Sequence, residues 1–387
     1  MLHTPETPDD LAEALNRAAR HLRTISLQGR GSKSMMAGPV AWADETITTT
    51  ELRRVLQYEP RDLTISVEAG LPWREFTALL RENRQMVPLD PPFAERATVG
   101  GVVASNSSGP RRRLYGTARD MVIGMWFVTL DRKFVQSGGM VVKNVAGLDM
   151  AKLMIGSFGT LAAIAVVNLK LAPAPEVERS FLLAFHSLRD AMAARNRILA
   201  SVLQPAAVDL LNQAAGTALG TAQGKAPWLL AIRTGGNRAA AGRYDRELAK
   251  LADCEALEGS PQEALWNAVE SFTPAFLERN RDGVVVRVSC TLKGLEDAMA
   301  SFRGPALARA GSGVCYGYFE ESEAAARWMV DAGRRGWKAV IEFSPEERKG
   351  TLDLWPAPGS DFELMKRLKG LFDPSNLLNR GRLYGRI

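Results

Sequence analysis

Histidine and cysteine are scarce in this chain, with three of each among 387 residues. No Cys-x-x-Cys pair occurs, which disfavours both zinc and iron–sulfur sites. The histidines are scattered and none falls beside a glycine-rich stretch, so we expect neither a histidine-based metal site nor a catalytic triad. Because the cysteine count is odd and the chain has the character of an intracellular protein, we expect buried free thiols at Cys254, Cys290 and Cys315.

Long hydrophobic runs are missing as well, since no apolar segment reaches the about 18 residues that span a bilayer. The first ten residues are polar and partly acidic, which argues against a secretory signal. We therefore expect a cytoplasmic protein without a transmembrane segment, held at the inner membrane only through partners.

The net charge of +6 is modest for this length and suits phosphate or carboxylate ligands. The densest basic run is Arg111-Arg112-Arg113. It is either a solvated loop or a surface complementary to a cofactor diphosphate or an acidic partner. No aromatic and basic stripe accompanies it, so nucleic acid is not an expected partner.

Two familiar nucleotide-binding motifs are absent. Gly29-Arg30-Gly31 begins like the dinucleotide-binding fingerprint, but Ser34 stands where the third glycine is needed. Lys33-Ser34 resembles the end of a P-loop, but the preceding pattern does not match. Rossmann-type NAD binding is therefore disfavoured.

Hydrophobic periodicity and turn residues predict an α+β protein. We predict helices over 11–22, 72–83, 98–105, 148–155, 187–201, 239–251, 260–271, 320–332 and 362–371. We predict strands over 24–27, 63–67, 121–130, 133–136, 161–171, 181–185, 228–233 and 284–289. Pro173 and Pro175 mark a domain boundary. The second part alternates strands and helices, which predicts an antiparallel sheet covered by helices, and no internal repeat is visible.

In place of the missing motifs, the first part carries three loops rich in small residues. They read QGRGSKS over 28–34, TVGGVVASNSSG over 98–109 and GSFGT over 156–160. Small residues allow the backbone to approach a bulky ligand closely, and free N–H groups in such turns bind anionic oxygens. Three loops of this kind predict one large phosphorylated cofactor.

The order of these loops resembles the FAD-binding fold of the vanillyl-alcohol oxidase and p-cresol methylhydroxylase (PCMH) family. The resemblance implies a two-part PCMH-type FAD-binding domain over 1–173, an α+β cap or substrate domain over 174–365, and a tail over 366–387 that returns to the FAD site. The expected cofactor-binding residues are Gly29, Arg30, Gly31, Ser32, Lys33, Pro91, Thr98, Gly100, Gly101, Ala104, Asn106, Ser107, Gly109, Tyr115, Gly116, Gly159, Thr160, Ile164 and Arg382. The loops contain neither histidine nor cysteine, so we expect FAD to bind non-covalently.

Further segments are similar to the FAD-binding E subunits of bacterial glycolate oxidase. They are DPPFAERAT over 90–98, GPRR over 109–112, VVKNVAGLD over 141–149, RVS over 287–289 and FDPSNLLNRGR over 372–382. The similarity is weaker between 176 and 283, and Arg380 replaces a proline that is usual in the tail. The resemblance implies a hetero-oligomer with a paralogous FAD-binding catalytic subunit and an iron–sulfur subunit.

The implied reaction is oxidation of glycolate to glyoxylate by hydride transfer to flavin. It needs a base for the hydroxyl proton and a cation for the carboxylate. Lys143 is a candidate for stabilising the reduced flavin, or else part of an exposed turn. Arg287 is a candidate for the substrate carboxylate or a subunit contact, or else a surface strand residue. No metal site is expected.

The sequence departs from the pattern of related 2-hydroxy-acid oxidising flavoproteins, because no histidine follows His186. Relatives use histidines there, often with a metal. Two alternatives stay open: a dehydrogenase subunit with its own substrate site, or an FAD-bearing structural or electron-relay subunit whose partner carries out the chemistry. Another 2-hydroxy-acid flavin dehydrogenase, or a flavin reductase of the same fold that acts on a peptidoglycan precursor, is a further possibility.

Overall fold

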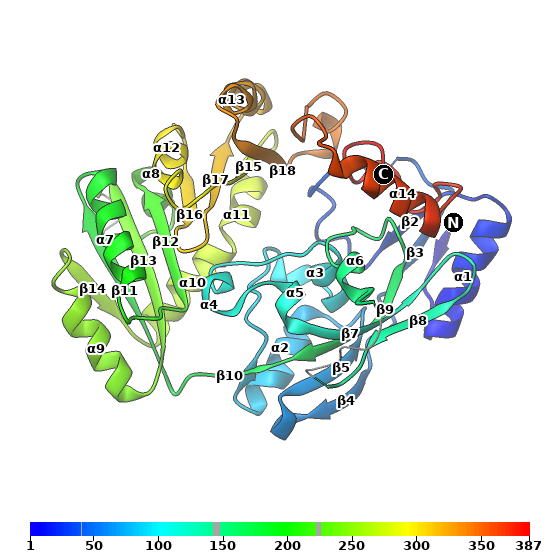
Figure 1. The fold of residues 1–387 in the computed structure, drawn as a ribbon, viewed down its shortest axis with the longest axis horizontal. Helices are drawn as coiled ribbons and strands as arrows, with labels where there is room; N and C mark the ends of the chain where they lie inside the picture. Colours follow the sequence, from blue (N-terminus) through cyan, green and yellow to red (C-terminus); the bar gives the residue numbers. More distant parts are fainter. Residues whose placement is uncertain (40, 142–147, 222–225) are drawn as a thin grey trace. The chain divides into compact units, whose positions relative to one another are not determined.

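A computed structural model of the chain describes residues 1–39, 41–141, 148–221 and 226–387 (Figure 1). The chain forms two compact units. Unit 1 contains residues 1–108, 116–174 and 357–387, and unit 2 contains residues 109–115 and 175–356. The division predicted from the sequence differs in two places, since it assigned 109–115 to the first domain and 357–365 to the second.

Unit 1 contains two main sheets. Strands β1 (Leu2–His3), β3 (Glu45–Thr48) and β2 (Ile25–Gln28) form a parallel sheet in that order. The antiparallel sheet has the order β4 (Val55–Glu59), β5 (Thr64–Glu68), β9 (Ala163–Lys170), β7 (Val122–Val128) and β8 (Phe134–Gly138). Strand β9 is the central strand and is buried over most of its length, in keeping with its continuous apolar sequence.

Helix α1 (Pro8–Arg20) begins three residues and ends two residues earlier than the helix predicted over 11–22. Thr7 accepts a hydrogen bond from the Asp10 N–H, and the Asp10 carboxylate accepts one from the Thr7 N–H, so this capping box starts the helix before the first apolar residue. Its apolar face, which includes Leu11 and Leu15, packs with Ile25 and Ile47 of the parallel sheet.

Unit 1 contains further helices and strands outside these two sheets. They are α2 (Trp73–Glu82), β6 (Gln85–Met86), α3 (Val99–Ala104), α5 (Ala118–Met121), α6 (Ala151–Met154), β10 (Ala172–Pro173) and α14 (Asp361–Phe372). The helix predicted over 148–155 is only one turn long, and the left-handed Gly156 (φ 80°) follows it closely.

Unit 2 is one eight-stranded antiparallel sheet in the order β14-β11-β13-β12-β16-β17-β15-β18 (Figure 1). The strands are β11 (Val177–Phe185), β12 (Ala207–Asn212), β13 (Trp228–Gly236), β14 (Cys254–Leu257), β15 (Val284–Ser289), β16 (Ala306–Arg309), β17 (Val314–Phe319) and β18 (Lys338–Phe343). The helices are α4 (Arg112–Tyr115), α7 (Leu188–Ala200), α8 (Gln213–Ala218), α9 (Arg238–Leu248), α10 (Ser260–Glu270), α11 (Phe272–Arg279), α12 (Leu295–Ala300) and α13 (Ser322–Arg334).

The sheet of unit 2 consists of two halves with related β-α-β-β-α-β connectivity, except that the first half has the additional helix α8 between β12 and β13. Strands β11 to β14 form one half and β15 to β18 the other, and each half has its strands in the order 4-1-3-2, the second read in reverse. The two halves join through β12 and β16. The sequence showed no internal repeat because the repeat is one of topology, and the two halves use different side chains.

Alternation along the strands gives the sheet of unit 2 two different faces. One face, with Leu210, Ile232 and Val286, packs against α7, α9, α12 and α13 in the main core. The opposite face carries charged and phenolic side chains, including Arg287, Arg309 and Tyr316.

Candidate functional site

The first and second small-residue loops of unit 1 touch where Gly29 meets the start of α3. A Cβ on Gly29 would lie 2.4 Å from Thr98 Oγ1, which is closer than any side chain tolerates. Thr98 is the N-cap of α3, and its hydroxyl accepts a hydrogen bond from the Gly101 N–H at 3.2 Å. Glycine at position 29 is therefore required for the two backbones to meet.

Helix α3 is held just as closely against strand β5. A Cβ on Gly100 would lie 2.6 Å from Ala69 Cβ and 2.9 Å from its carbonyl oxygen. The Gly100 N–H donates to that same carbonyl at 2.7 Å. The third loop joins the other end of the helix, since the Phe158 N–H donates to the Ala104 carbonyl at 2.9 Å. All three loops thus form one contiguous loop cluster, defined as residues 29–33, 98–107 and 156–160.

The C-terminal tail closes this loop cluster through Asn379. The Asn379 amide N–H groups donate to the carbonyls of Leu27 (2.9 Å) and Phe158 (2.7 Å), and its oxygen accepts from the Leu27 N–H at 2.7 Å. One buried side chain therefore links the strand that enters the first loop to the third loop.

Two further tail residues hold the loop cluster with buried positive charge. The Arg382 guanidinium donates to the carbonyls of Lys33 and Gly38 and lies 5.3 Å from the centre of the Phe158 ring. Lys369 donates to the Thr160 carbonyl at 2.8 Å and pairs with Asp373 at 2.6 Å. The tail is thus an integral part of the loops.

Two buried polar atoms of the loop cluster lack a partner among the described residues. Lys33 is 8% exposed and its ammonium makes no hydrogen bond, while Asn106 Oδ1 accepts none. Burial lowers the pKa of Lys33 from 10.5 to about 8. A ligand with an anionic group could pair with the Lys33 ammonium, and an N–H or O–H donor on the same ligand could bond to Asn106 Oδ1. FAD has both, so these residues fit it.

Most of the predicted cofactor-binding residues belong to unit 1, and two belong to unit 2. Those in unit 1 are Gly29, Arg30, Gly31, Ser32, Lys33, Pro91, Thr98, Gly100, Gly101, Ala104, Asn106, Ser107, Gly116, Gly159, Thr160, Ile164 and Arg382. Among them Pro91, Gly116, Ile164 and the tail residue Arg382 lie outside the loop cluster, on other segments of unit 1. Gly109 and Tyr115 belong to unit 2, and the candidate Lys143 lies outside the described residues.

The buried Lys33 predicts a specific pH dependence for the FAD-free chain. Its pKa is about 8 in the folded chain and about 10.5 in the unfolded chain, so the unfolded chain binds more protons between these values. The free energy of unfolding should therefore rise by about 3 kcal/mol from pH 8 to pH 10.5. Urea unfolding at several pH values measures this rise, and Lys33→Met should remove it. An equal rise in Lys33→Met would contradict the assignment.

The polar face of unit 2 carries a second candidate site, the arginine–tyrosine cluster, defined as Asp209, Arg287, Arg309, Tyr316 and Glu342. Arg309 and Asp209 face each other across β16 and β12 and form a buried ion pair. The Arg309 guanidinium also lies 5.7 Å from the centre of the Tyr316 ring.

Arg287 occupies the next strand of this cluster. It faces Tyr316 across β15 and β17, and its Nε lies 2.9 Å from Glu342 Oε1. Desolvation raises the pKa of Glu342, which the Arg287 charge opposes, and desolvation also raises the pKa of Tyr316 to about 12. Arg112 contributes positive charge to both groups. The cluster can therefore hold an anion while keeping a neutral phenol beside it.

Two protein-family models match most of the chain. Residues 1–138 match the FAD binding domain, and residues 174–354 and 357–383 match the C-terminal domain of FAD linked oxidases. The chain belongs to the FAD-linked oxidases. The cofactor of this FAD-linked oxidase chain is thus FAD, and the PCMH-type α+β fold predicted from the sequence is confirmed.

Individual relatives of this FAD-linked oxidase chain include subunits of glycolate oxidase. It is 35% identical over 194 residues to glycolate oxidase subunit GlcE of Escherichia coli (strain K12), covering 50% of this chain and 55% of the relative. It is 27% identical over 211 residues to subunit GlcD of Bacillus subtilis (strain 168), covering 54% and 44%. The chain therefore spans about half the length of these relatives. A D-lactate dehydrogenase of Archaeoglobus fulgidus is 24% identical over 416 residues, covering 99% and 91%.

Solved structures show the same fold at low identity. A 4-ethylphenol oxidase from Gulosibacter chungangensis matches with a TM-score of 0.77 and 13% identity, covering 100% of this chain and 89% of the other. An alkyldihydroxyacetonephosphate synthase matches with a TM-score of 0.72 and 18% identity, covering 98% and 75%.

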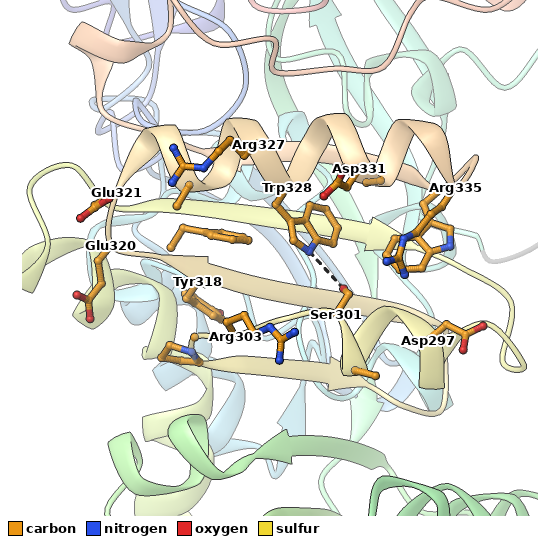
Figure 2. Close-up of a pocket in the computed structure, with 17 residues that line it drawn as sticks. Asp297, Ser301, Arg303, Tyr318, Glu320, Glu321, Arg327, Trp328, Asp331 and Arg335 are labelled. Carbon is orange, nitrogen blue, oxygen red and sulfur yellow. Dashed lines mark hydrogen bonds between the residues drawn. The ribbon is translucent and has the colours of Figure 1, made fainter.

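A groove of about 740 Å³ lies beside α13 of unit 2 (Figure 2), and its lining contains no residue of the loop cluster or of the arginine–tyrosine cluster. Trp328 lines it and donates to Ser301 Oγ at 3.3 Å, with its ring stacked on Phe302. Its lining contains three arginines and four carboxylates, among them Arg335 and Asp331 (Figure 2), so the groove has no preference for one sign of charge. It contains none of the residues predicted from the sequence.

Among residues 1–39, 41–141, 148–221 and 226–387, no three histidine, cysteine, aspartate or glutamate side chains gather to hold a metal ion. Within the same ranges, no helix has the length and hydrophobicity to cross a membrane.

Several residues that the structure brings to the sites were not predicted from the sequence as site residues: Lys369, Asn379, Asp209, Arg309, Tyr316 and Glu342. The tail residue Asn379 had a signal, because it stands in the segment that resembles the glycolate oxidase subunits. Arg309 and Asp209 had none, since 100 residues separate them and their pairing depends on β12 and β16 being neighbours.

Proposed function

We propose that this chain is the FAD-binding subunit of a glycolate oxidase-type assembly, and that it oxidises glycolate, or a closely related 2-hydroxy acid, to the 2-oxo acid. The observation that carries the proposal is the loop cluster with its unmatched Lys33 ammonium and Asn106 oxygen. The similarity to GlcE and to D-lactate dehydrogenases supports the choice of substrate.

The residues of the loop cluster would hold FAD through backbone N–H groups and one cation. Lys33 would pair with a phosphate oxygen, and the close contacts at Gly29 and Gly100 keep the loop backbones free of side chains that would compete. When bound, FAD supplies the acceptor for the hydride that leaves the α-carbon of the substrate.

Unit 2 would bind the carboxylate of the substrate and accept its hydroxyl proton. A 2-hydroxy acid presents a carboxylate, and Arg287 is the proposed cation for it, in exchange for part of its contact with Glu342. The raised pKa of Glu342 makes this carboxylate easier to protonate than an ordinary one, so Glu342 is a proposed acceptor for the hydroxyl proton. Lys143 stays a proposal for stabilising the reduced flavin.

The second candidate function is that of an FAD-bearing structural or electron-relay subunit. It is favoured by the absence of histidine after His186, because the proton acceptor and any metal would then come from another chain. Both functions assume partners, for which we propose a paralogous FAD-binding subunit and an iron–sulfur subunit.

Anaerobic addition of glycolate to the purified, FAD-loaded chain separates the two functions. A dehydrogenase subunit should lose its flavin absorbance with glycolate and with D-lactate at different rates. A relay subunit should keep its oxidised spectrum until the partner subunits are added, and that result would contradict the proposed substrate site.

Arg287→Met should raise the KM for the 2-hydroxy acid about 10- to 100-fold, because one charge-assisted contact to the carboxylate is lost. The flavin content should not change. The matched control is Arg243→Met, which removes an exposed arginine from α9 of the same unit. Steady-state kinetics measures the effect, and an unchanged KM would remove Arg287 from the substrate site.

A further inference from the structure

Cys290 and Cys315 form a thiol pair on the helix-covered side of the sheet in unit 2. Cys315 lies on β17 opposite Val288 of β15, and the Cys290 N–H continues this ladder by donating to the Gly313 carbonyl at 2.9 Å. The two cysteines are therefore diagonal neighbours on one face, and the Cys290 thiol donates to the Gly313 carbonyl at 3.6 Å. Cys315 is fully buried, whereas Cys290 is only partly buried.

A buried guanidinium lies beside this pair. Arg195 of α7 is 1% exposed and donates to the carbonyls of Leu292 (2.8 Å) and Ala310 (3.2 Å). Its Nε has no hydrogen-bond partner, and among the described residues Arg195 belongs to no ion pair, although Glu296 contributes negative charge to it. Its charge therefore lacks a direct counter-ion, which costs several kcal/mol in a protein interior.

The groups that face Arg195 come from the surrounding elements. They are Cys290 at the end of β15, Glu296 of α12 and Cys315 on β17. A Cys290 thiolate would supply the missing negative charge. The hydrogen bond from Cys315 lowers the pKa of Cys290, and the Arg195 charge adds to that shift against the effect of burial.

We propose that Cys290 and Cys315 are a peroxide-reactive dithiol, in which Arg195 holds Cys290 as the attacking thiolate and Cys315 resolves it into a disulfide. This site is independent of the proposed oxidation of 2-hydroxy acids. Its substrate class is hydrogen peroxide or a small alkyl hydroperoxide.

The chemistry balances in two steps. The Cys290 thiolate attacks one peroxide oxygen and the O–O bond breaks, which converts Cys290 to a sulfenic acid. The leaving hydroxide takes up a proton from the solvent and becomes water. The Cys315 sulfur, losing its proton, then attacks the Cys290 sulfur, the S–O bond breaks and a second water leaves. Together the two thiols lose two electrons, and one hydrogen peroxide takes them up and becomes two waters.

The backbone at Cys290 permits this closure. Diagonal neighbours lie about 7–8 Å apart at Cα, just beyond the usual span of a disulfide, so a small shift is needed. Cys290 is the first residue after β15, and residues 291–293 that follow it are exposed. The shift therefore disturbs only the end of the ladder.

Intact mass and peptide mapping of the full chain after stoichiometric hydrogen peroxide test this proposal. We expect the loss of two hydrogen atoms, a peptide that joins Cys290 to Cys315, and reversal by dithiothreitol. Cys290→Ser and Cys315→Ser should each abolish the mass change. Cys254→Ser is the matched control and should leave it intact, because burial raises the pKa of the Cys254 thiol to about 11.

Alkylation kinetics give a second readout that does not depend on closure. Iodoacetamide should modify Cys290 about tenfold faster than Cys254, and Arg195→Met should reduce that preference if the variant folds. Oxidation of Cys254 at the same rate as Cys290, or over-oxidation of Cys290 with Cys315 still a thiol, would overturn the proposal. Neither outcome bears on the proposed reaction at the flavin.

Discussion

Lys33→Met is expected to weaken FAD binding by roughly 10²- to 10³-fold, because the buried diphosphate loses its cation and the usual cost of such a loss is about 3–5 kcal/mol. The same variant should make the FAD-free chain more stable at pH 7, by up to about 3 kcal/mol. The reason is that the wild-type ammonium is buried without a partner when FAD is absent.

These opposite signs separate a ligand-binding role from a structural one. FAD affinity is measured by the quenching of flavin fluorescence, and the stability of the FAD-free chain by urea unfolding. Lys250→Met is the matched control, because that ammonium is exposed and pairs only with Glu247, so both quantities should stay within error. A Lys33→Met chain that binds FAD normally, or that is destabilised without FAD, contradicts the assigned role.

Asn379→Ala should destabilise unit 1 by about 3–5 kcal/mol and weaken FAD binding as well. The substitution leaves the Leu27 N–H and the carbonyls of Leu27 and Phe158 without the partner they share, and each unsatisfied buried group costs about 1–3 kcal/mol. FAD affinity should fall because the first and third loops are no longer linked through one side chain.

Asn376→Ala is a close control for this effect. Asn376 (φ 49°) and Asn379 (φ 40°) both have left-handed backbones, so alanine brings the same strain of about 1 kcal/mol at each position. Asn376 is exposed, however, and lies outside the contacts that join the loops. Urea unfolding and FAD titration of both variants measure the difference. Equal losses in the two variants would mean that strain, and not the linkage of the loops, explains the effect.

The sequence predicted those elements whose local pattern is strong. The strand over 284–289 has the predicted bounds, and the buried central strand β9 follows from its unbroken apolar run. The small-residue loops were predicted because small residues let the backbone approach a bulky ligand, whereas the contacts that the structure shows at Gly29 and Gly100 are with Thr98 and Ala69 of the chain itself. Strands β12 and β16 to β18 were missed, although β12, β17 and β18 have six residues each, as β15 has. The pairing of β12 with β16 joins residues 100 positions apart, which no local pattern reveals.

Long-range pairing explains the part of the sites that was not predicted. Asn379 joins residues more than 200 positions away, and its hydrogen bonds exist only once the tail pairs with β2 at Ile25. Arg287 was predicted as a cation, but its partner Glu342 becomes apparent only when β15 and β18 are adjacent. Local patterns could therefore predict what the loops bind, but not what holds them in place.

Acid precipitation of the purified chain, followed by absorption spectra of the pellet and the supernatant, decides whether the loop cluster binds FAD without a covalent bond. We expect a colourless pellet and a yellow supernatant whose flavin is FAD, in about equal molar amount to the chain. Flavin that stays in the pellet, or a chain that neither carries nor takes up FAD, would contradict it.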